Sequence, residues 1–287
     1  MTSKIIFTPR ILSEVQNSIS KFDISCIENA TIEELQEKIG KLILTYSSKC
    51  YNINPGGVIL RGRINNLNDL FTTTEQLWYP PSDKIDKIGR CNNIGQSLFY
   101  CSIDPKTILR ELRPEKNNWI TILECSTPNR AWSSLMPIGI LALKNINNDL
   151  YTIFANHFNT SFLISENDKK INLLLETFLT DIFQKKEREF YKLTVAISNI
   201  LLIDKKVNGI IYPSIASNFD GLNFVLRPHF ADLNITPYHA AVYQIVERTG
   251  SRYFLKRIYN SSFLNSHNLF EWIKIPDNNI PPAEYLI

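Results

Sequence analysis

The sequence lacks the residue patterns of common metal and redox sites. Its cysteines form an odd set with no CxxC spacing: Cys26, Cys50, Cys91, Cys101 and Cys125. Its histidines lie far apart, whereas a zinc site needs closely spaced Cys/His pairs. We therefore expect no metal. We also expect free thiols, which are typical of a reducing compartment and favour a cytoplasmic protein.

Long apolar runs and clusters of basic residues are also missing. No stretch approaches the ~18 apolar residues of a membrane span, and the N-terminal residues lack the apolar core of a signal peptide. The net charge is +3, with Lys and Arg spread along the chain rather than gathered in a basic stripe. We therefore expect neither a membrane nor a nucleic-acid partner. An anionic small ligand is compatible with this charge.

Three familiar catalytic motifs are absent: the Walker P-loop, GxSxG and HExxH. The turn at Gly56 and Gly57 precedes no expected helix, so it is not a phosphate cradle. A hydrolase that pairs Ser214 with His229 or His239 stays open, although Ser214 follows a proline rather than a strand-to-helix elbow. A Cys/His pair is an equally unsupported alternative.

Helices are expected near the N-terminus and in the middle of the chain. Residues 31–46 combine a capping box at Thr31 and Glu34 with apolar residues at helical spacing. Residues 168–186 carry a wide apolar face, and residues 187–203 continue helically. Because Asn, Pro and Gly interrupt the pattern at 52–57, we predict an N-terminal helical arm (1–56) and a main domain (57–287).

Strands are expected on both sides of the helical middle. The expected strands cover residues 58–60, with Arg61 at the end, and residues 97–101, 119–125, 209–212, 223–226, 241–247 and 252–259. The last two form a hairpin. A helix starts at Asp104–Pro105 and ends at Pro114, and the tail from Pro276 is expected to lie loosely over the surface. The pattern predicts an α+β fold, strand-rich in both halves and helical in the middle.

A dispersed polar set accompanies these strands and the helix after Asp104. It consists of Arg61, Gly89–Asn92, Tyr100, Glu111 and Tyr212–Ser214. Arginine binds phosphate through paired donors, tyrosine can stack on a planar ring, and a carboxylate can stabilise positive charge or hold a ribose hydroxyl. Each residue alone is more often a surface ion pair, a core aromatic or a solvated carboxylate. The hypothesis of a dinucleotide site therefore depends on the whole set.

Three segments carry a resemblance to a known family: "ILRGR" at 59–63, "GRCNNIGQSLFYCSIDPKTILRELRP" at 89–114 and "NGIIYPSIASNFDGLNFVLRP" at 208–228. Over roughly residues 57–128 and 205–260, the chain resembles the RES domain family, named for an arginine, a glutamate and a serine. That family includes NAD-consuming toxins of bacterial toxin–antitoxin pairs. The resemblance implies a strand-rich, ADP-ribosyltransferase-like core.

The resemblance also implies roles for individual residues. Arg61 and Arg90 correspond to diphosphate-binding arginines, and Tyr100 to an aromatic contact on the nicotinamide side. Glu111 corresponds to the catalytic acidic residue and Ser214 to a hydrogen-bonding residue of the active site. Three further residues are expected near the ligand: Tyr79, and Asn92 and Asn223, which would order the surrounding loops.

The function that the resemblance implies is cleavage of the nicotinamide–ribose bond of NAD, by a glycohydrolase or phosphorylase restrained by a cognate antitoxin. ADP-ribosyl transfer to a macromolecule is an alternative on the same fold. A catalytically silent binding or assembly module is another. Compact toxins of the family lack the arm at 1–56 and an insertion as large as 129–204. These helices could form a homo-oligomer interface, a partner platform or a lid. Their broad apolar faces could equally be buried against their own domain.

Overall fold

The structure is a computed structural model of the 287-residue chain, and it describes residues 11–22, 27–43, 46, 50–51, 56–66, 69–127, 134–144, 146–158, 165–261, 269–276 and 283–285. The helices are α1 (Leu12–Ser20), α2 (Ile32–Ile43), α3 (Pro105–Leu112), α4 (Asn148–Phe158), α5 (Glu166–Phe183), α6 (Tyr191–Leu201) and α7 (Pro228–Asn234). Short 3-10 helices are η2 (Thr74–Leu77), η3 (Ser82–Lys84), η4 (Ile140–Leu143) and η5 (Arg188–Phe190). The expected α+β class is confirmed.

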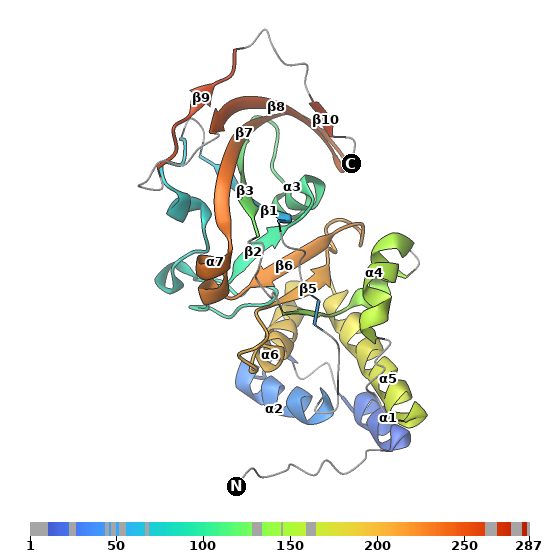
Figure 1. Ribbon diagram of the computed structural model, residues 1–287. Helices are drawn as coiled ribbons and strands as arrows, with labels where there is room; N and C mark the ends of the chain where they lie inside the picture. Colours follow the sequence, from blue (N-terminus) through green and yellow to red (C-terminus); the bar gives the residue numbers. More distant parts are fainter. Residues whose placement is uncertain are drawn as a thin grey trace.

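The strands form one sheet that is antiparallel except for one pair. They are β1 (Val58–Asn65), β2 (Phe99–Ser102), β3 (Trp119–Ser126), β4 (Leu135–Pro137), β5 (Gly209–Pro213), β6 (Leu222–Leu226), β7 (Thr236–Thr249), β8 (Arg252–Ser261), β9 (Ile273–Lys274) and β10 (Ala283–Tyr285). Their order is β10-β8-β7-β3-β1-β2-β6-β5-β4, with β9 beside β8 and a parallel β4–β5 pair. The expected β7–β8 hairpin is confirmed and arches over one end of the molecule (Figure 1).

The two central strands β1 and β2 separate almost as soon as they meet. β1 pairs with β3 along its whole length, but with β2 only at Leu60 and Ser102. Arg61 was expected at the end of a strand that stops at Leu60. That expectation was wrong, because β1 continues to Asn65 along β3. Arg61 instead lies at the point where β1 leaves β2.

The two faces of the sheet pack against different layers. Alternation along β2 sends Phe99 and Cys101 into a core with η2, α4 and α7, while Tyr100 faces the other way. On that second face, Ile210 and Val225 pack against α2, α5 and α6. Further along the same face, α3 covers β1, β3 and β7. The second face therefore carries two helical layers, with a space between them.

The helices α1 and α2 of the arm form one layer with α5 and α6 of the insertion, at the end of the molecule opposite the hairpin (Figure 1). The capping box of α2 is present, since Thr31 N donates to Glu34 Oε2 at 2.8 Å and Glu34 N to Thr31 Oγ1 at 3.1 Å. The apolar stripe of α2 packs on α6, and α1 packs on α5. These apolar faces are thus buried within the chain itself. They therefore no longer favour a homo-oligomer interface.

Other expectations about local structure are confirmed in part and corrected in part. Residues 187–203 were expected to be helical, and the 3-10 helix η5 followed directly by α6 confirms this. The tail was expected to lie loosely on the surface. Instead, Ala283–Tyr285 pairs with β8 as an edge strand, while residues 277–282 and 286–287 lie outside the described residues. The helix α4 and the strand β4 were not predicted.

A buried carboxyl group links the arm to the insertion. Glu176 of α5 is fully buried; its Oε2 accepts from the Tyr46 hydroxyl at 2.6 Å and its Oε1 from Ile140 N at 3.1 Å. Burial raises the pKa of Glu176 from 4.5 to about 7, although its hydrogen bonds act in the opposite direction. The folded protein therefore binds this proton more tightly than the unfolded chain does.

Glu176→Gln is expected to change how stability depends on pH. In the wild type, this group's contribution to the free energy of unfolding falls as pH rises from about 4.5 to about 7, then levels off, because only the folded state holds the proton there. Denaturant unfolding at pH 5, 6, 7 and 8 should show a flatter profile for Glu176→Gln. The exposed Glu187→Gln should keep the wild-type profile. Parallel profiles for wild type and Glu176→Gln would contradict the assignment.

Candidate active site

A cavity of about 490 Å³ lies where β1 and β2 separate, between α3 and the helical layer. Four side chains from four neighbouring strands form one row along it. Strand register places Leu60, Ser102, Asn223 and Tyr212 opposite one another in turn, and all four are buried and line the cavity. Directly paired residues project from the same face of a sheet. This row therefore forms a continuous floor.

The wall opposite the helical layer is α3, and local sequence explains its position. The Asp104 side chain caps the helix by accepting from Lys106 N at 3.1 Å and Thr107 N at 3.2 Å, with Pro105 at the first helical position. At Gly62 of β1, a Cβ atom would lie 2.3 Å from Ile108 Cγ2. The glycine of the "RGR" run thus lets α3 approach the strand closely, which brings Glu111 to the cavity.

The Glu111 carboxylate is fixed through one of its oxygens. Oε1 accepts hydrogen bonds from Ser214 Oγ at 2.7 Å and from Asn223 Nδ2 at 2.6 Å. Ser214 is fully buried, whereas Glu111 itself is exposed at the cavity. No described residue hydrogen-bonds the second oxygen, Oε2. The carboxylate is therefore oriented by two donors from β5 and β6 and keeps one oxygen free for a ligand.

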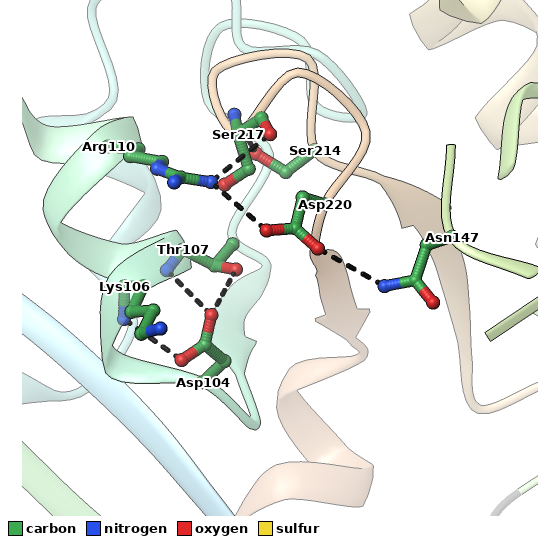
Figure 2. Close-up of polar contacts among 8 residues, drawn as sticks. All are labelled: Asp104, Lys106, Thr107, Arg110, Asn147, Ser214, Ser217 and Asp220. Carbon is green, nitrogen blue, oxygen red and sulfur yellow. Dashed lines mark hydrogen bonds and ion pairs between the residues drawn. The ribbon is translucent and has the colours of Figure 1, made fainter. Parts of the chain in front are cut away.

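A second set of contacts holds α3 against the turn that follows β5. Figure 2 shows Arg110 Nη1 donating to Ser217 O at 3.2 Å and pairing with Asp220 Oδ2 at 3.7 Å. The other oxygen of Asp220 accepts from Asn147 Nδ2 at 3.2 Å, just before α4. In the same turn, Ser217 N donates to Ser214 Oγ at 3.1 Å. These contacts fix the distance between the helix that carries Glu111 and the strand end that carries Ser214.

Arg61 bridges the separating strands. Its Nε donates to Leu77 O at 2.7 Å and its Nη1 to Tyr100 O at 2.6 Å, with the guanidinium 5.2 Å from the Phe99 ring centroid. It is only 9% exposed. Burial, with a smaller contribution from the neighbouring Arg63, lowers the pKa of Arg61 to about 10, so it stays charged at neutral pH. No described carboxylate lies within ion-pair distance, which leaves a positive charge at the cavity.

Arg90 lies within a tight turn, Gly89–Asn92, that hydrogen bonds to Tyr100 hold in place. The Tyr100 hydroxyl donates to Asn92 Oδ1 at 2.9 Å and accepts from Cys91 N at 3.0 Å. A Cβ at Gly89 would lie 2.2 Å from Asn92 Oδ1, so glycine is needed there. The role of Asn92 in ordering this loop thus has a structural basis in the Tyr100 contact.

The Arg90 guanidinium extends from that turn to the insertion. Its Nη1 donates to Phe183 O and its Nη2 to Lys185 O, both at 3.1 Å, and it lies 4.8 Å from the Tyr191 ring centroid. The carbonyls at a helix C-terminus lack helical partners and attract cations. Arg90 thereby joins the end of α5 to the cavity, and Tyr191 and Arg188 add to the cavity wall.

The charged residues of the lining are strongly unequal in sign. Five are cationic and one is anionic: Arg61, Arg63, Lys87, Arg90 and Arg188, against Glu111. Three tyrosines, Tyr100, Tyr191 and Tyr212, lie among them with several aliphatic side chains. Guanidinium groups bind phosphate oxygens in pairs, and aromatic rings suit planar bases. The lining is suited to an elongated anionic ligand with planar groups.

The structure brings six of the eight predicted site residues to the cavity: Arg61, Arg90, Asn92, Tyr100, Glu111 and Asn223. Ser214 is not among the lining residues, but its hydroxyl donates to Glu111, which is. Tyr79 is not among the lining residues. Its hydroxyl donates to Asp232 Oδ2 at 2.7 Å, beside Trp78 Nε1, which donates to Oδ1 at 2.8 Å. The Tyr79 hydroxyl therefore holds its loop against α7 through Asp232.

Four charged or aromatic lining residues were not singled out from the sequence: Arg63, Lys87, Arg188 and Tyr191. Tyr212 belonged to the predicted polar set but had no role of its own. Arg63 could have been predicted from the sequence, because period-two alternation puts it on the same side of β1 as Arg61. Arg188 and Tyr191 belong to the insertion, for which an interface, a partner platform or a lid had been considered. In the structure the insertion forms part of the cavity wall.

The described contacts of Ser214 do not include the Ser/His pair considered from the sequence. The Ser214 hydroxyl bonds Glu111 and Ser217, while His239 contacts Glu124 Oε1 at 3.1 Å and Asn260 Oδ1 at 2.6 Å. Among the described residues, no three His, Cys, Asp or Glu side chains gather in a way that could hold a metal ion. Within the same ranges, no helix has the length and apolar character needed to cross a membrane.

Comparison with protein-family models and with curated proteins gives no match to this chain. The class of protein is therefore defined by its own geometry: an α+β protein whose central sheet opens into a cationic cavity with one oriented carboxylate.

Proposed function

We propose that this protein is a RES-like enzyme that cleaves the bond between nicotinamide and ribose in NAD. The observation that carries the proposal is the Glu111 carboxylate, oriented by Ser214 and Asn223 in a cavity whose other charged residues are all cationic. An enzyme of this kind must bind a diphosphate and stabilise positive charge that develops on a sugar ring. The cavity offers both kinds of group at once.

In this proposal the cations of the lining bind the diphosphate. Arg61 is immobilised by two carbonyl contacts and Arg90 by two others, so little side-chain entropy is lost on binding. As the C–N bond breaks, its electron pair leaves with nicotinamide, and the ribose carbon becomes positively charged. The negative Glu111 stabilises that charge. Water then adds to the carbon and releases a proton, giving ADP-ribose and nicotinamide.

The direct test is to incubate the purified protein with NAD and separate the products by chromatography. ADP-ribose and nicotinamide are the expected products in water, and ADP-ribose 1″-phosphate would appear instead if inorganic phosphate is the acceptor. Nicotinamide mononucleotide, which lacks the diphosphate, should be a poor substrate. Intact NAD at high protein concentration would refute the proposal and leave a binding module as the interpretation.

Ser214→Ala is expected to lower kcat by roughly 10- to 100-fold, because one hydrogen bond to a charged group is lost while Asn223 retains the other. The matched control is Ser217→Ala, three residues away, since the Ser217 hydroxyl is buried without a hydrogen-bond partner among the described residues. It should leave kcat near the wild-type value. Equal kcat values for the two variants would contradict a positioning role for Ser214.

The resemblance extends the proposal beyond chemistry. It implies an ADP-ribosyltransferase-like core, a role as a growth-arrest effector, and a cognate antitoxin protein. The expected free thiols favour action in the cytoplasm. Expression in a bacterial host, with cellular NAD and growth followed together, tests the effector role. Glu111→Gln is the matched inactive form. NAD depletion and growth arrest by the wild type alone are the expected result.

A further inference from the structure

Tyr212 is a buried cavity residue whose hydroxyl has no partner in the described part of the chain. It lies in β5 directly opposite Asn223 of β6, and it is only 4% exposed. Its ring packs against Phe183, with 5.8 Å between the centroids. No described residue hydrogen-bonds the hydroxyl, although the residue lines the cavity. The hydroxyl is not among the buried unpartnered atoms of the described residues, so it is accessible from the cavity and can bond a group that enters there.

Tyr100, on the same floor, shows the opposite situation. Its hydroxyl both donates to Asn92 Oδ1 and accepts from Cys91 N, so its hydrogen-bonding capacity is used by the protein. The sequence had assigned the ligand contact to Tyr100. The structure leaves Tyr100 able to offer its ring face, whereas the available phenolic hydroxyl belongs to Tyr212.

We propose that the Tyr212 hydroxyl donates a hydrogen bond to a polar group of the substrate beside the scissile bond. This inference rests on the proposed function. Its geometric basis is the strand register: Asn223, which fixes Glu111, is the direct cross-strand neighbour of Tyr212, and such neighbours lie about 5 Å apart at Cβ. Tyr212 therefore occupies the floor position next to the residue that orients the carboxylate.

The hydroxyl is suited to donate this hydrogen bond. Burial first, and then nearby groups including Cys91, Tyr100 and Glu111, hold the pKa of Tyr212 well above its ordinary value. The phenol is therefore neutral and retains its proton. Two neutral groups of NAD flank the scissile bond and can accept it: a hydroxyl of the nicotinamide-side ribose and the carboxamide oxygen of nicotinamide.

The experiment compares Tyr212→Phe with Tyr100→Phe in kinetics and thermal unfolding. Tyr212→Phe should keep the wild-type thermal midpoint and lower kcat/KM for NAD by roughly 3- to 10-fold, the effect of one neutral hydrogen bond. Tyr100→Phe removes two internal hydrogen bonds and should lower the thermal midpoint. An unchanged kcat/KM for Tyr212→Phe would overturn the inference, and so would a thermal midpoint that falls as much as that of Tyr100→Phe.

Two substrate analogues identify the accepting group. One lacks the 2′-hydroxyl of the nicotinamide-side ribose, and the other carries a thioamide in place of the carboxamide. With the analogue that lacks the true acceptor, wild type and Tyr212→Phe should have the same kcat/KM, since the interaction is already lost. A full difference with both analogues would overturn a contact beside the scissile bond. Failure of the wild type to cleave NAD would instead overturn the proposed function, and this inference with it.

Discussion

Glu111→Gln is expected to lower kcat for NAD cleavage by at least about 100-fold, the usual effect of removing one electrostatic group that acts on the transition state. The substitution removes charge but keeps the geometry. An amide oxygen can still accept from both Ser214 Oγ and Asn223 Nδ2, so the side chain should keep its orientation. The thermal midpoint should therefore stay close to that of the wild type.

Glu115→Gln is the control for this substitution. Glu115 lies shortly after α3, is 73% exposed at its side chain and pairs with Arg248 rather than with any cavity residue. Its kcat should match that of the wild type. Near-normal NAD cleavage by a folded Glu111→Gln protein would remove Glu111 from the mechanism.

Arg61→Lys is expected to impair both stability and activity, although the charge is retained. A guanidinium reaches Leu77 O and Tyr100 O at once through different nitrogens, whereas a single ammonium on a flexible stem does not reproduce that fork. One buried carbonyl left without its donor costs about 1–3 kcal/mol, or roughly 3–10 °C in the thermal midpoint. Because Arg61 also bridges β1 and β2, the cavity should change shape and kcat/KM should fall.

Arg90→Lys provides the comparison. Arg90 is partly exposed, so water can replace a lost hydrogen bond, and its loss of stability should be smaller than that of Arg61→Lys. Differential scanning calorimetry without ligand measures the loss of stability in each variant. The rise in thermal midpoint on adding ADP-ribose measures how well each variant still binds it. A wild-type midpoint for Arg61→Lys would show that the bridge between the strands is dispensable.

Local signals in the sequence predicted the elements that position the site. The capping box before α2, Asp104 and Pro105 before α3, and the hairpin of β7 and β8 each depend on neighbouring residues, and each is present. The proximity of Glu111 and Ser214 was an expectation from resemblance. In the structure the two residues are hydrogen-bonded.

What the sequence did not predict depends on contacts between distant segments. Arg61 looks like a polar strand end, but the extension of β1 along β3 encloses it. Tyr79 looks like a ring available to a ligand, but Asp232, far along the chain, takes its hydroxyl. Tyr191 reads as the start of a core helix, but it lines the cavity beside the Arg90 guanidinium. None of these partners is visible in a local window.

The order of the segments along the chain gives the Glu111 contacts a further consequence. Glu111 is in the first half of the chain, whereas its two donors, Ser214 and Asn223, follow α6. During synthesis from the N-terminus, a ribosome-bound chain that ends at α6 carries the carboxylate and Arg61 but neither donor. The reacting group is thus oriented only after β5 and β6 have emerged and joined the sheet beside β2, so the site is completed late in translation.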